Sequence, residues 1–348
     1  MPSATPSRAA ARRGLIASGL LAAGLALAQG AAAQVVLTAS SWAAPTHALS
    51  IAQAAWCDDV ATATEGRVRC RILPRPVAPA PRTFDAVRDG LVDIAYSIHG
   101  HTPDGYRLTR IAELPFLGDS AVATSIAYQR IHERHLAKFD EHRGLKVLGV
   151  FTHGPGMIFN VRRPVARIAD LAGLRIRVGG GMASEVARAI GIDARLAPAS
   201  QSSELLASGG VDGVLLPAES VRSLGLGKLL RHRSAIPGGL YNTSFAFVMN
   251  RHAWERIPGR DREIIGQLSG EAVAAHFGRH WDIEDRRSLA LQQAEGIGAI
   301  TADAAFVGQI RARTAGIERA WIELAEQEGL ANAKQVLAEF RREIAALR

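Results

Sequence analysis

The segment RIRVGGGMASEVARAIG, residues 175–191, contains the unit from which the fold is predicted. A short strand-like run at 175–178 leads through three glycines into a helical pattern at 183–190, which ends at Gly191. Glycine suits both the turn and the helix end because it adopts backbone conformations that other residues avoid. A strand that runs directly into a helix is half of a βαβ unit, in which helices cover a parallel sheet.

Strand-like and helical segments alternate on both sides of this unit. Apolar runs predict strands at 35–39, 67–73, 92–96, 145–151, 158–161, 175–178, 211–216 and 241–250. Helical patterns lie at 48–63, 84–89, 120–143, 183–190, 200–208, 260–295, 303–328 and 331–347. Two alternating blocks followed by a long helix predict an α/β protein with two lobes. Since open α/β sheets bind ligands at the carboxyl ends of their strands, we expect a cleft between the lobes.

The composition is that of an ordinary globular protein. Charged residues make up 21% of the 348 residues, which excludes disordered, collagen-like and coiled-coil classes. Two cysteines exclude a disulfide-dense scaffold and a zinc finger. Lys and Arg exceed Asp and Glu by 41 to 33, but the charges are interspersed and aromatic residues are only 5%. We therefore expect no nucleic-acid partner.

The first 33 residues have the parts of a secretory signal peptide. Arg8, Arg12 and Arg13 form a positive start, an apolar run covers 15–28, and small residues precede a cleavage site after about Ala33. A membrane anchor is the alternative, although the run is short for a span of about 20 residues. We expect export to the periplasm, and the sequence leaves open whether the Sec or the Tat route is used.

Export would place Cys57 and Cys70 in an oxidising compartment. Cys57 lies in the helical pattern and Cys70 in the strand-like run that follows it, so a helix–strand hairpin would bring the two together. We expect a disulfide between them, with two buried thiols that never meet as the alternative.

Several phrases occur in one order along the chain: DGLVDI at 89–94, ELPF at 113–116, DLAGLRIRV at 170–178, ELLASGGVDG at 204–213 and GGLYNTSFAFVMN at 238–250. A long helix after Pro258 follows them, and Trp56-Cys57 with Cys70 matches the cysteine pair of a subgroup. Together these features resemble the DctP-type periplasmic solute-binding proteins of TRAP transporters.

The resemblance implies a two-lobed α/β periplasmic binding protein fold, with a ligand cleft between the lobes and a long helix crossing both. The expected lobes are 34–154 with 242–281, and 155–241 with 282–348. It also implies a protein that is not an enzyme and needs no cofactor. Its partners would be a small organic carboxylate, such as a branched or aromatic monocarboxylate, and the permease subunits of a sodium-coupled transporter.

The resemblance further implies that Arg177 pairs with the ligand carboxylate. A guanidinium fits a carboxylate with two parallel hydrogen bonds. In a strand, Arg175 and Arg177 point to the same face, and Arg177 is nearer the end where the cleft is expected. Without the resemblance, two surface arginines on a half-buried strand would be the simpler interpretation.

Three positions depart from polar residues found in some members of that family. Met157 replaces a second arginine, Leu216 an asparagine and Ile98 an acidic residue. These replacements favour a smaller or more apolar carboxylate over a sialic-acid-like polyol. Further pocket candidates lie near strand ends, and packing or loop hydrogen bonding is the alternative for each of them: Trp42, Ser97, His99, His153, Phe159 and Tyr241.

The alternative function is a periplasmic hydrolase or isomerase acting on a small organic acid. The sequence offers little for such chemistry. A glycine pattern at 179–184 only faintly resembles a dinucleotide-binding motif, and no G-x-S-x-G nucleophile motif occurs. Histidine pairs at 132/135 and 276/280 have metal-like spacing, but solvated helix faces explain them better, so we expect no metal site.

Overall fold

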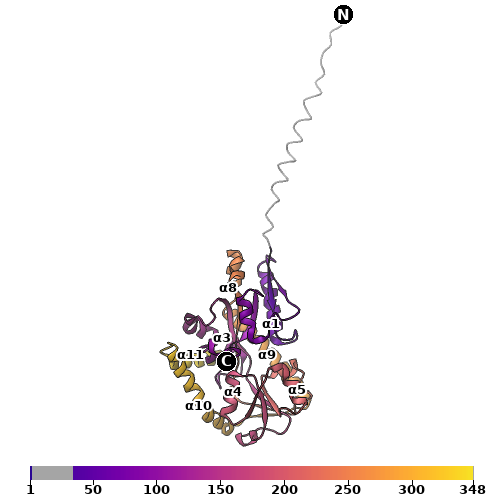
Figure 1. The fold of residues 1–348 in the computed structure, drawn as a ribbon, viewed down its shortest axis with the longest axis vertical. Coiled ribbons are helices and arrows are strands. Elements are labelled where there is room, and N and C mark those ends of the chain that lie inside the picture. The colour runs from indigo at the N-terminus through magenta and orange to yellow at the C-terminus, as the bar shows by residue number, and fades with distance from the viewer. Residues whose placement is uncertain (2–33, 348) are drawn as a thin grey trace.

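Two β-sheets organise the chain in the computed structural model, which describes Met1 and residues 34–347 (Figure 1). The first sheet has the order β2(Val68–Ile72), β1(Val35–Ser40), β3(Ile94–Ile98), β10(Ser244–Asn250), β4(Leu145–Thr152). The second has the order β11(Gly298–Thr301), β9(His232–Ala235), β5(Met157–Asn160), β8(Gly213–Leu216), β6(Arg175–Val178), β7(Asp193–Leu196). The two-lobed α/β fold that the sequence predicts is therefore confirmed.

Helices surround each sheet. The first lobe consists of the first sheet with α1(Ala48–Ala63), α2(Thr83–Arg88) and α3(Ala121–Ile131). The second lobe consists of the second sheet with α4(Gly181–Ala189), α5(Ser202–Ala207) and α6(Ala218–Ser223). The remaining helices are α7(Arg251–Arg256), α8(Gly259–Gln267), α9(Glu271–Ala294), α10(Ala304–Gln327) and α11(Ala333–Ala346). Figure 1 shows α1 and α8 in the upper lobe, and α4 and α5 in the lower one.

Both sheets are mixed, whereas the alternating pattern predicted parallel strands. Strand β10 is antiparallel to β3 and β4, and β5 is antiparallel to β8 and β9. The reason is the route of the chain between the lobes. Strands of βαβ units run toward the cleft, but β5 and β10 each begin where the chain enters a lobe from the cleft, so they run away from it.

The long helical pattern at 260–295 is two helices. Gly270, with a φ of +62°, separates α8 from α9, and its N–H donates to the carbonyl of Leu148 at 2.6 Å. Helix α9 packs against α1 and α3 of the first lobe and against α6 of the second. The crossing helix of the prediction is therefore α9. Similarly, the helix predicted at 120–143 ends at Ile131 and continues as shorter turns.

The C-terminal helices lie on different lobes. Helix α10 packs against α4, whereas α11 packs against α3, where Arg130 pairs with Glu343 at 2.8 Å. The predicted boundaries of the lobes stay a prediction. The contacts of α11 favour moving the last helix from the second lobe to the first.

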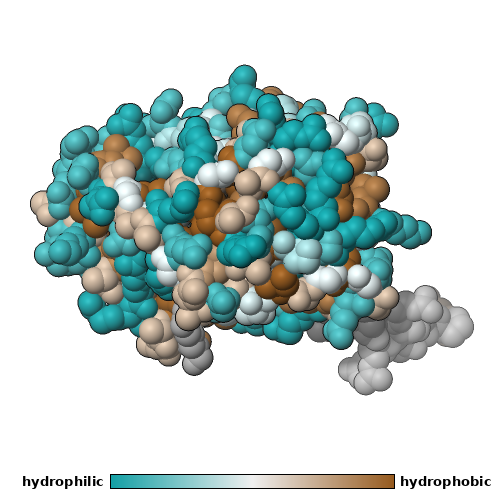
Figure 2. Space-filling model, turned by 90° about the horizontal axis from the view of Figure 1, so that it is seen from below, coloured by the Kyte–Doolittle hydropathy of each residue, from teal (hydrophilic) through white to brown (hydrophobic). Residues whose placement is uncertain are grey.

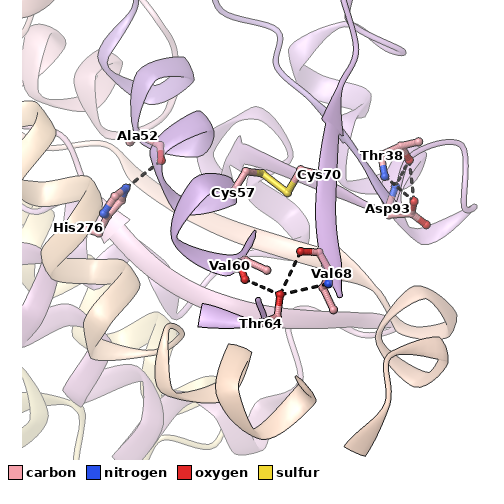
Figure 3. Close-up of a disulfide and its surroundings, with 9 residues drawn as sticks. All are labelled: Thr38, Ala52, Cys57, Val60, Thr64, Val68, Cys70, Asp93 and His276. Carbon is pink, nitrogen blue, oxygen red and sulfur yellow. Dashed lines mark hydrogen bonds between the residues drawn. A yellow bond between two sulfur atoms is a disulfide. The ribbon is translucent and has the colours of Figure 1, made fainter. Parts of the chain in front are cut away.

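The predicted disulfide is confirmed. Cys57 of α1 and Cys70 of β2 are bonded, with their Cα atoms 5.6 Å apart (Figure 3). Thr64 supports the same hairpin, because its hydroxyl donates to the carbonyl of Val60 at 2.7 Å and accepts from the N–H of Val68 at 3.1 Å.

The predicted signal peptide lies, apart from Met1, outside the described residues. In the part of the chain that the structure covers, no helix has both the length and the apolar character needed to cross a membrane. Figure 2 shows the end of the molecule formed by the lower lobe of Figure 1. Hydrophilic side chains cover most of this face, and apolar ones form small separate patches.

Candidate functional site

Arg177 is a buried cation without a carboxylate partner. Its side chain lies on β6 at 3% exposure, and its Nε donates to the carbonyl of Ala197 at 2.8 Å. Burial lowers its pKa to about 10, so it stays charged at neutral pH. Among residues 34–347 no Asp or Glu lies within ion-pair distance of it. Arg175 differs, since it pairs with Asp212 at 3.0 Å at the surface.

The glycines after β6 make room for this side chain. A Cβ built on Gly179 would lie 3.3 Å from Nη2 of Arg177. Gly180 and Gly181 have φ values of +94° and +54°, which other residues rarely adopt. The segment 175–181 therefore ends a strand, holds a guanidinium and begins a helix at the carboxyl edge of the second sheet.

Six aromatic side chains from both lobes form a continuous series of neighbouring rings, and we call them the aromatic wall: Trp42, His47, His101, His153, Tyr241 and Trp281. Successive ring centroids are separated by 6.3 Å for Trp42–His101, 6.4 Å for Trp42–His47, 5.4 Å for His47–Trp281, 5.7 Å for His153–Trp281 and 5.7 Å for His153–Tyr241.

Arg177 lies near the two ends of the aromatic wall, Tyr241 and His101. Its charge acts on the pKa values of both residues. Burial raises the pKa of Tyr241 and lowers that of His101, and the nearby cation lowers both. The result is one buried positive charge close to two neutral aromatic side chains, one at each end of the aromatic wall.

Local contacts set the orientation of each ring. Trp42 donates its indole N–H to the carbonyl of Tyr96 at 3.1 Å. His47 caps α1, because its Nδ1 accepts from the N–H of Leu49 at 3.2 Å. Tyr241 lies directly over Gly156, where an added Cβ would come within 2.1 Å of the tyrosine ring.

The predicted residues Trp42, His153, Tyr241 and Arg177 are thus brought together. Ser97 instead donates to the carbonyl of Ala80 at 2.9 Å. Phe159 and Leu216 lie in an apolar cluster of the second lobe, together with Met157. Met157 also lines a surface hollow of about 220 Å³, together with residues 235–237.

His99 belongs to a separate polar network in the first lobe. Its Nδ1 lies 2.9 Å from the hydroxyl of Ser244, which donates to Glu113 at 2.8 Å. Its Nε2 lies 2.8 Å from Nε2 of His142. Burial lowers the pKa of His99 to about 3, so both rings stay neutral at neutral pH.

Sequence reasoning missed His47, His101 and Trp281. His101 lies two residues after the predicted His99, at the end of the same strand, and this proximity is the signal that could have found it. His47 directly precedes the helical pattern at 48–63, and Trp281 shows only as an apolar position of a long helix.

Carboxylates join the two lobes beside the wall. Glu219 of α6 is fully buried and accepts from the N–H of Ala48 at 3.3 Å, and Nε2 of His47 lies 3.5 Å from it. Asp285 of α9 accepts from the N–H of Glu219 at 2.6 Å, and burial raises its pKa to about 8. These contacts link α6 of the second lobe to α1 of the first lobe and to α9.

The arrangement suits binding of an anion. Among the described residues no three His, Cys, Asp or Glu side chains are placed to hold a metal ion. A buried guanidinium with free donors and apolar rings around it is complementary to a carboxylate on an apolar body. Fold and site therefore define a two-lobed solute-binding protein.

Comparisons with known proteins agree with this class. The model of the family "Bacterial extracellular solute-binding protein, family 7" (DctP) matches residues 39–315. The chain therefore belongs to the DctP family. It is 31% identical to "Outer membrane transporter protein TsaT" of Comamonas testosteroni over 295 residues, which cover 84% of this chain and 86% of that protein.

Solved structures of TRAP periplasmic solute-binding proteins have the same fold. One from Bordetella bronchiseptica, with bound (R)- and (S)-mandelate, has a TM-score of 0.87 and 42% identity, and the match covers 90% of this chain and 100% of that chain. One from Rhodoferax ferrireducens, in complex with benzoate, has a TM-score of 0.83 and 27% identity, and the match covers 90% and 98%.

The predicted family and function are thereby confirmed. The chain is the periplasmic solute-binding component of a TRAP-type transporter, and it works with membrane permease subunits. The family consists of solute-binding proteins, so the chain is a solute receptor and not a hydrolase or isomerase.

Proposed function

We propose that this protein captures a monocarboxylate with an aromatic body. Arg177 pairs with the carboxylate, and the aromatic wall packs around the ring. The observation that carries the proposal is the buried guanidinium, which has no acidic partner among residues 34–347. A buried cation is stable only when an anion or hydrogen-bond acceptors compensate it, and a ligand carboxylate supplies both.

The relatives support an aromatic acid. Mandelate and benzoate are the ligands of the two structures above, and 3-hydroxybenzoate is that of a marine metagenome protein with a TM-score of 0.83 and 27% identity. The prediction that a polyol is disfavoured depends on Met157, Leu216 and Ile98 being ligand contacts. As ligand contacts, Met157 and Leu216 stay predictions, as do Ser97, His99 and Phe159.

We further propose that the lobes open and close about the two crossing segments 154–157 and 241–245. A ligand that enters the open form would draw the lobes together, so that Glu219 of the second lobe contacts Ala48 and His47 of the first. Closure excludes water and so strengthens the ion pair of Arg177. The closed form would then deliver the acid to the permease.

For export, we propose cleavage of the signal peptide after Ala33, which leaves Gln34 as the first residue. Intact-mass analysis of protein isolated from the periplasm tests this site. A mature protein that begins at a residue other than Gln34 would contradict cleavage after Ala33.

Isothermal titration calorimetry with benzoate, mandelate and 3-hydroxybenzoate tests the binding proposal. Arg177→Met leaves the ligand charge unpaired, and losing one partner of a buried ion pair costs about 3–5 kcal/mol. Since about 1.4 kcal/mol corresponds to a tenfold change in affinity, we expect binding to weaken by roughly 100-fold or more.

Arg195→Met is the matched control. Arg195 is the register neighbour of Arg177 on β7, but it is exposed and pairs with Asp193 at 2.7 Å. The variant Arg195→Met removes one positive charge from the neighbouring strand, and we expect its affinity for the acids to stay within about twofold of that of the wild type. Equal affinity of wild type and Arg177→Met, with both proteins folded by circular dichroism, would exclude Arg177 as the carboxylate partner.

A further inference from the structure

Two neighbouring rings of the aromatic wall, Trp281 and His153, each carry a nitrogen without a hydrogen-bond partner among residues 34–347, and that of Trp281 is fully buried. Trp281 is 2% exposed, and its Nε1 is buried without a partner among the described residues. Leaving a buried donor unsatisfied is destabilising, so such a group in a binding site calls for an acceptor. The residue lies on α9, at the crossing between the lobes, and its ring contacts His47 and His153.

His153 supplies the complementary atom. Its Nδ1 lies in hydrogen-bond contact with the carbonyl of Gly154, so Nδ1 carries the proton and donates it. Burial lowers the pKa of His153 to about 4, and the ring is therefore neutral at neutral pH. Nε2 is then an acceptor, and no hydrogen bond to it occurs among residues 34–347.

The other polar atoms of the wall are already engaged or belong to the carboxylate end. Nδ1 of His47 accepts from Leu49, which places its proton on Nε2, facing Glu219. The indole of Trp42 donates to Tyr96. Nδ1 of His101 also lacks a partner, but His101 lies at the Arg177 end.

One free donor and one free acceptor thus lie on neighbouring rings, whose centroids are 5.7 Å apart. A hydroxyl is the small group that satisfies both, because its oxygen accepts one hydrogen bond while its proton donates another. A methyl group or a bare ring hydrogen leaves both atoms unpaired.

We propose that Trp281 and His153 recognise a hydroxyl on the ligand, so that the substrate class is hydroxylated aromatic carboxylates. This inference rests on the proposed function, since Arg177 must first hold the carboxylate. The hydroxyl belongs either to the carbon next to the carboxylate, as in mandelate, or to the aromatic ring, as in 3-hydroxybenzoate. Two matched ligand pairs distinguish these positions.

Calorimetry on the wild-type protein compares mandelate with phenylacetate, and 3-hydroxybenzoate with benzoate. Each pair differs by one hydroxyl. We expect the hydroxylated acid of at least one pair to bind about 10–100-fold more tightly, which corresponds to leaving a donor and an acceptor unpaired in the other complex. The pair that shows this ratio identifies the position of the hydroxyl.

Trp281→Phe removes the N–H and keeps an aromatic ring. We expect it to reduce the ratio within that pair to about threefold or less, mainly by weakening the hydroxylated acid. Trp321→Phe is the matched control, because Trp321 is a buried tryptophan of α10 whose Nε1 also lacks a partner but lies outside the wall. It should leave the ratio unchanged.

The outcomes separate the two proposals. If the wild type binds both members of each pair equally, and Arg177→Met weakens all four acids, the hydroxyl inference is wrong and the carboxylate proposal stands. A ratio in the wild type that Trp281→Phe leaves intact also overturns the inference. If none of the four acids binds, both proposals fail. The comparison of the ligand pairs uses wild-type protein alone, so its result does not depend on whether a variant folds.

Discussion

Removing the disulfide tests how the first lobe is held together. The bond joins α1 to β2 and closes a loop with a sequence separation of 13 residues. In the chain-entropy model, a loop of about this length stabilises the folded state by about 3 kcal/mol, because it restricts the unfolded chain. The variant with Cys57→Ala and Cys70→Ala should lose about that free energy of unfolding.

The variant should still fold. The hydroxyl of Thr64 bonds both sides of the turn between α1 and β2, and Trp56 is buried in the core of the first lobe. For a lobe of 150–250 residues, a loss of about 3 kcal/mol lowers Tm by roughly 6–12 °C. Ligand affinity should stay within about twofold, since the bond lies outside the aromatic wall.

Urea unfolding with and without a thiol reductant gives the measurement. The oxidised wild type should be the most stable form. The reduced wild type and the double variant should coincide, and the reductant should leave the variant unchanged. Equal unfolding free energies of oxidised wild type and variant would falsify the loop-entropy reasoning. A variant that loses ligand binding would show that the bond shapes the site.

Three other perturbations act at the contacts between the lobes. Glu113→Ala removes a buried carboxylate that accepts from the N–H and hydroxyl of Ser244 and lies beside Gly181 of the second lobe, so we expect at least about tenfold weaker binding and a larger radius of gyration by X-ray scattering. An unchanged radius would contradict this role. Asp285 has a pKa raised to about 8, above its unfolded value of about 4, so its protonated form stabilises the fold below pH 4 and this stabilisation is lost as the pH rises to 8. Asp285→Asn should flatten the fall in stability over this range by up to about 1.4 kcal/mol per pH unit in urea unfolding, and identical slopes would argue against it. Gly156→Ala places a Cβ within 2.1 Å of the ring of Tyr241 and should weaken binding at least about tenfold by calorimetry, whereas Gly266→Ala, which meets no atom within 4 Å, should not.

Local patterns were sufficient for most of the fold. Apolar runs and helical periodicity predicted β1, β2, β4 and β6, together with α1, α10 and α11, to within a few residues. Short strands at the sheet edges were missed, because four residues with exposed side chains show no apolar run. Strand direction was wrong for β5 and β10, since direction depends on where the chain crosses between lobes and not on composition.

The sequence by itself indicated the family and the disulfide partners, and it singled out Arg177 as the candidate for the carboxylate contact. The disulfide pair and Arg177 depend on local segments in which a helix and a strand are adjacent in the chain, whereas the family shows in the order of several phrases along it. Only the tertiary structure decided which groups surround the arginine. It set His99 apart from His101 and brought Trp42, His153 and Trp281 to one site. These residues come from distant segments, and they meet because α9 and the two crossings hold both lobes around the same cation.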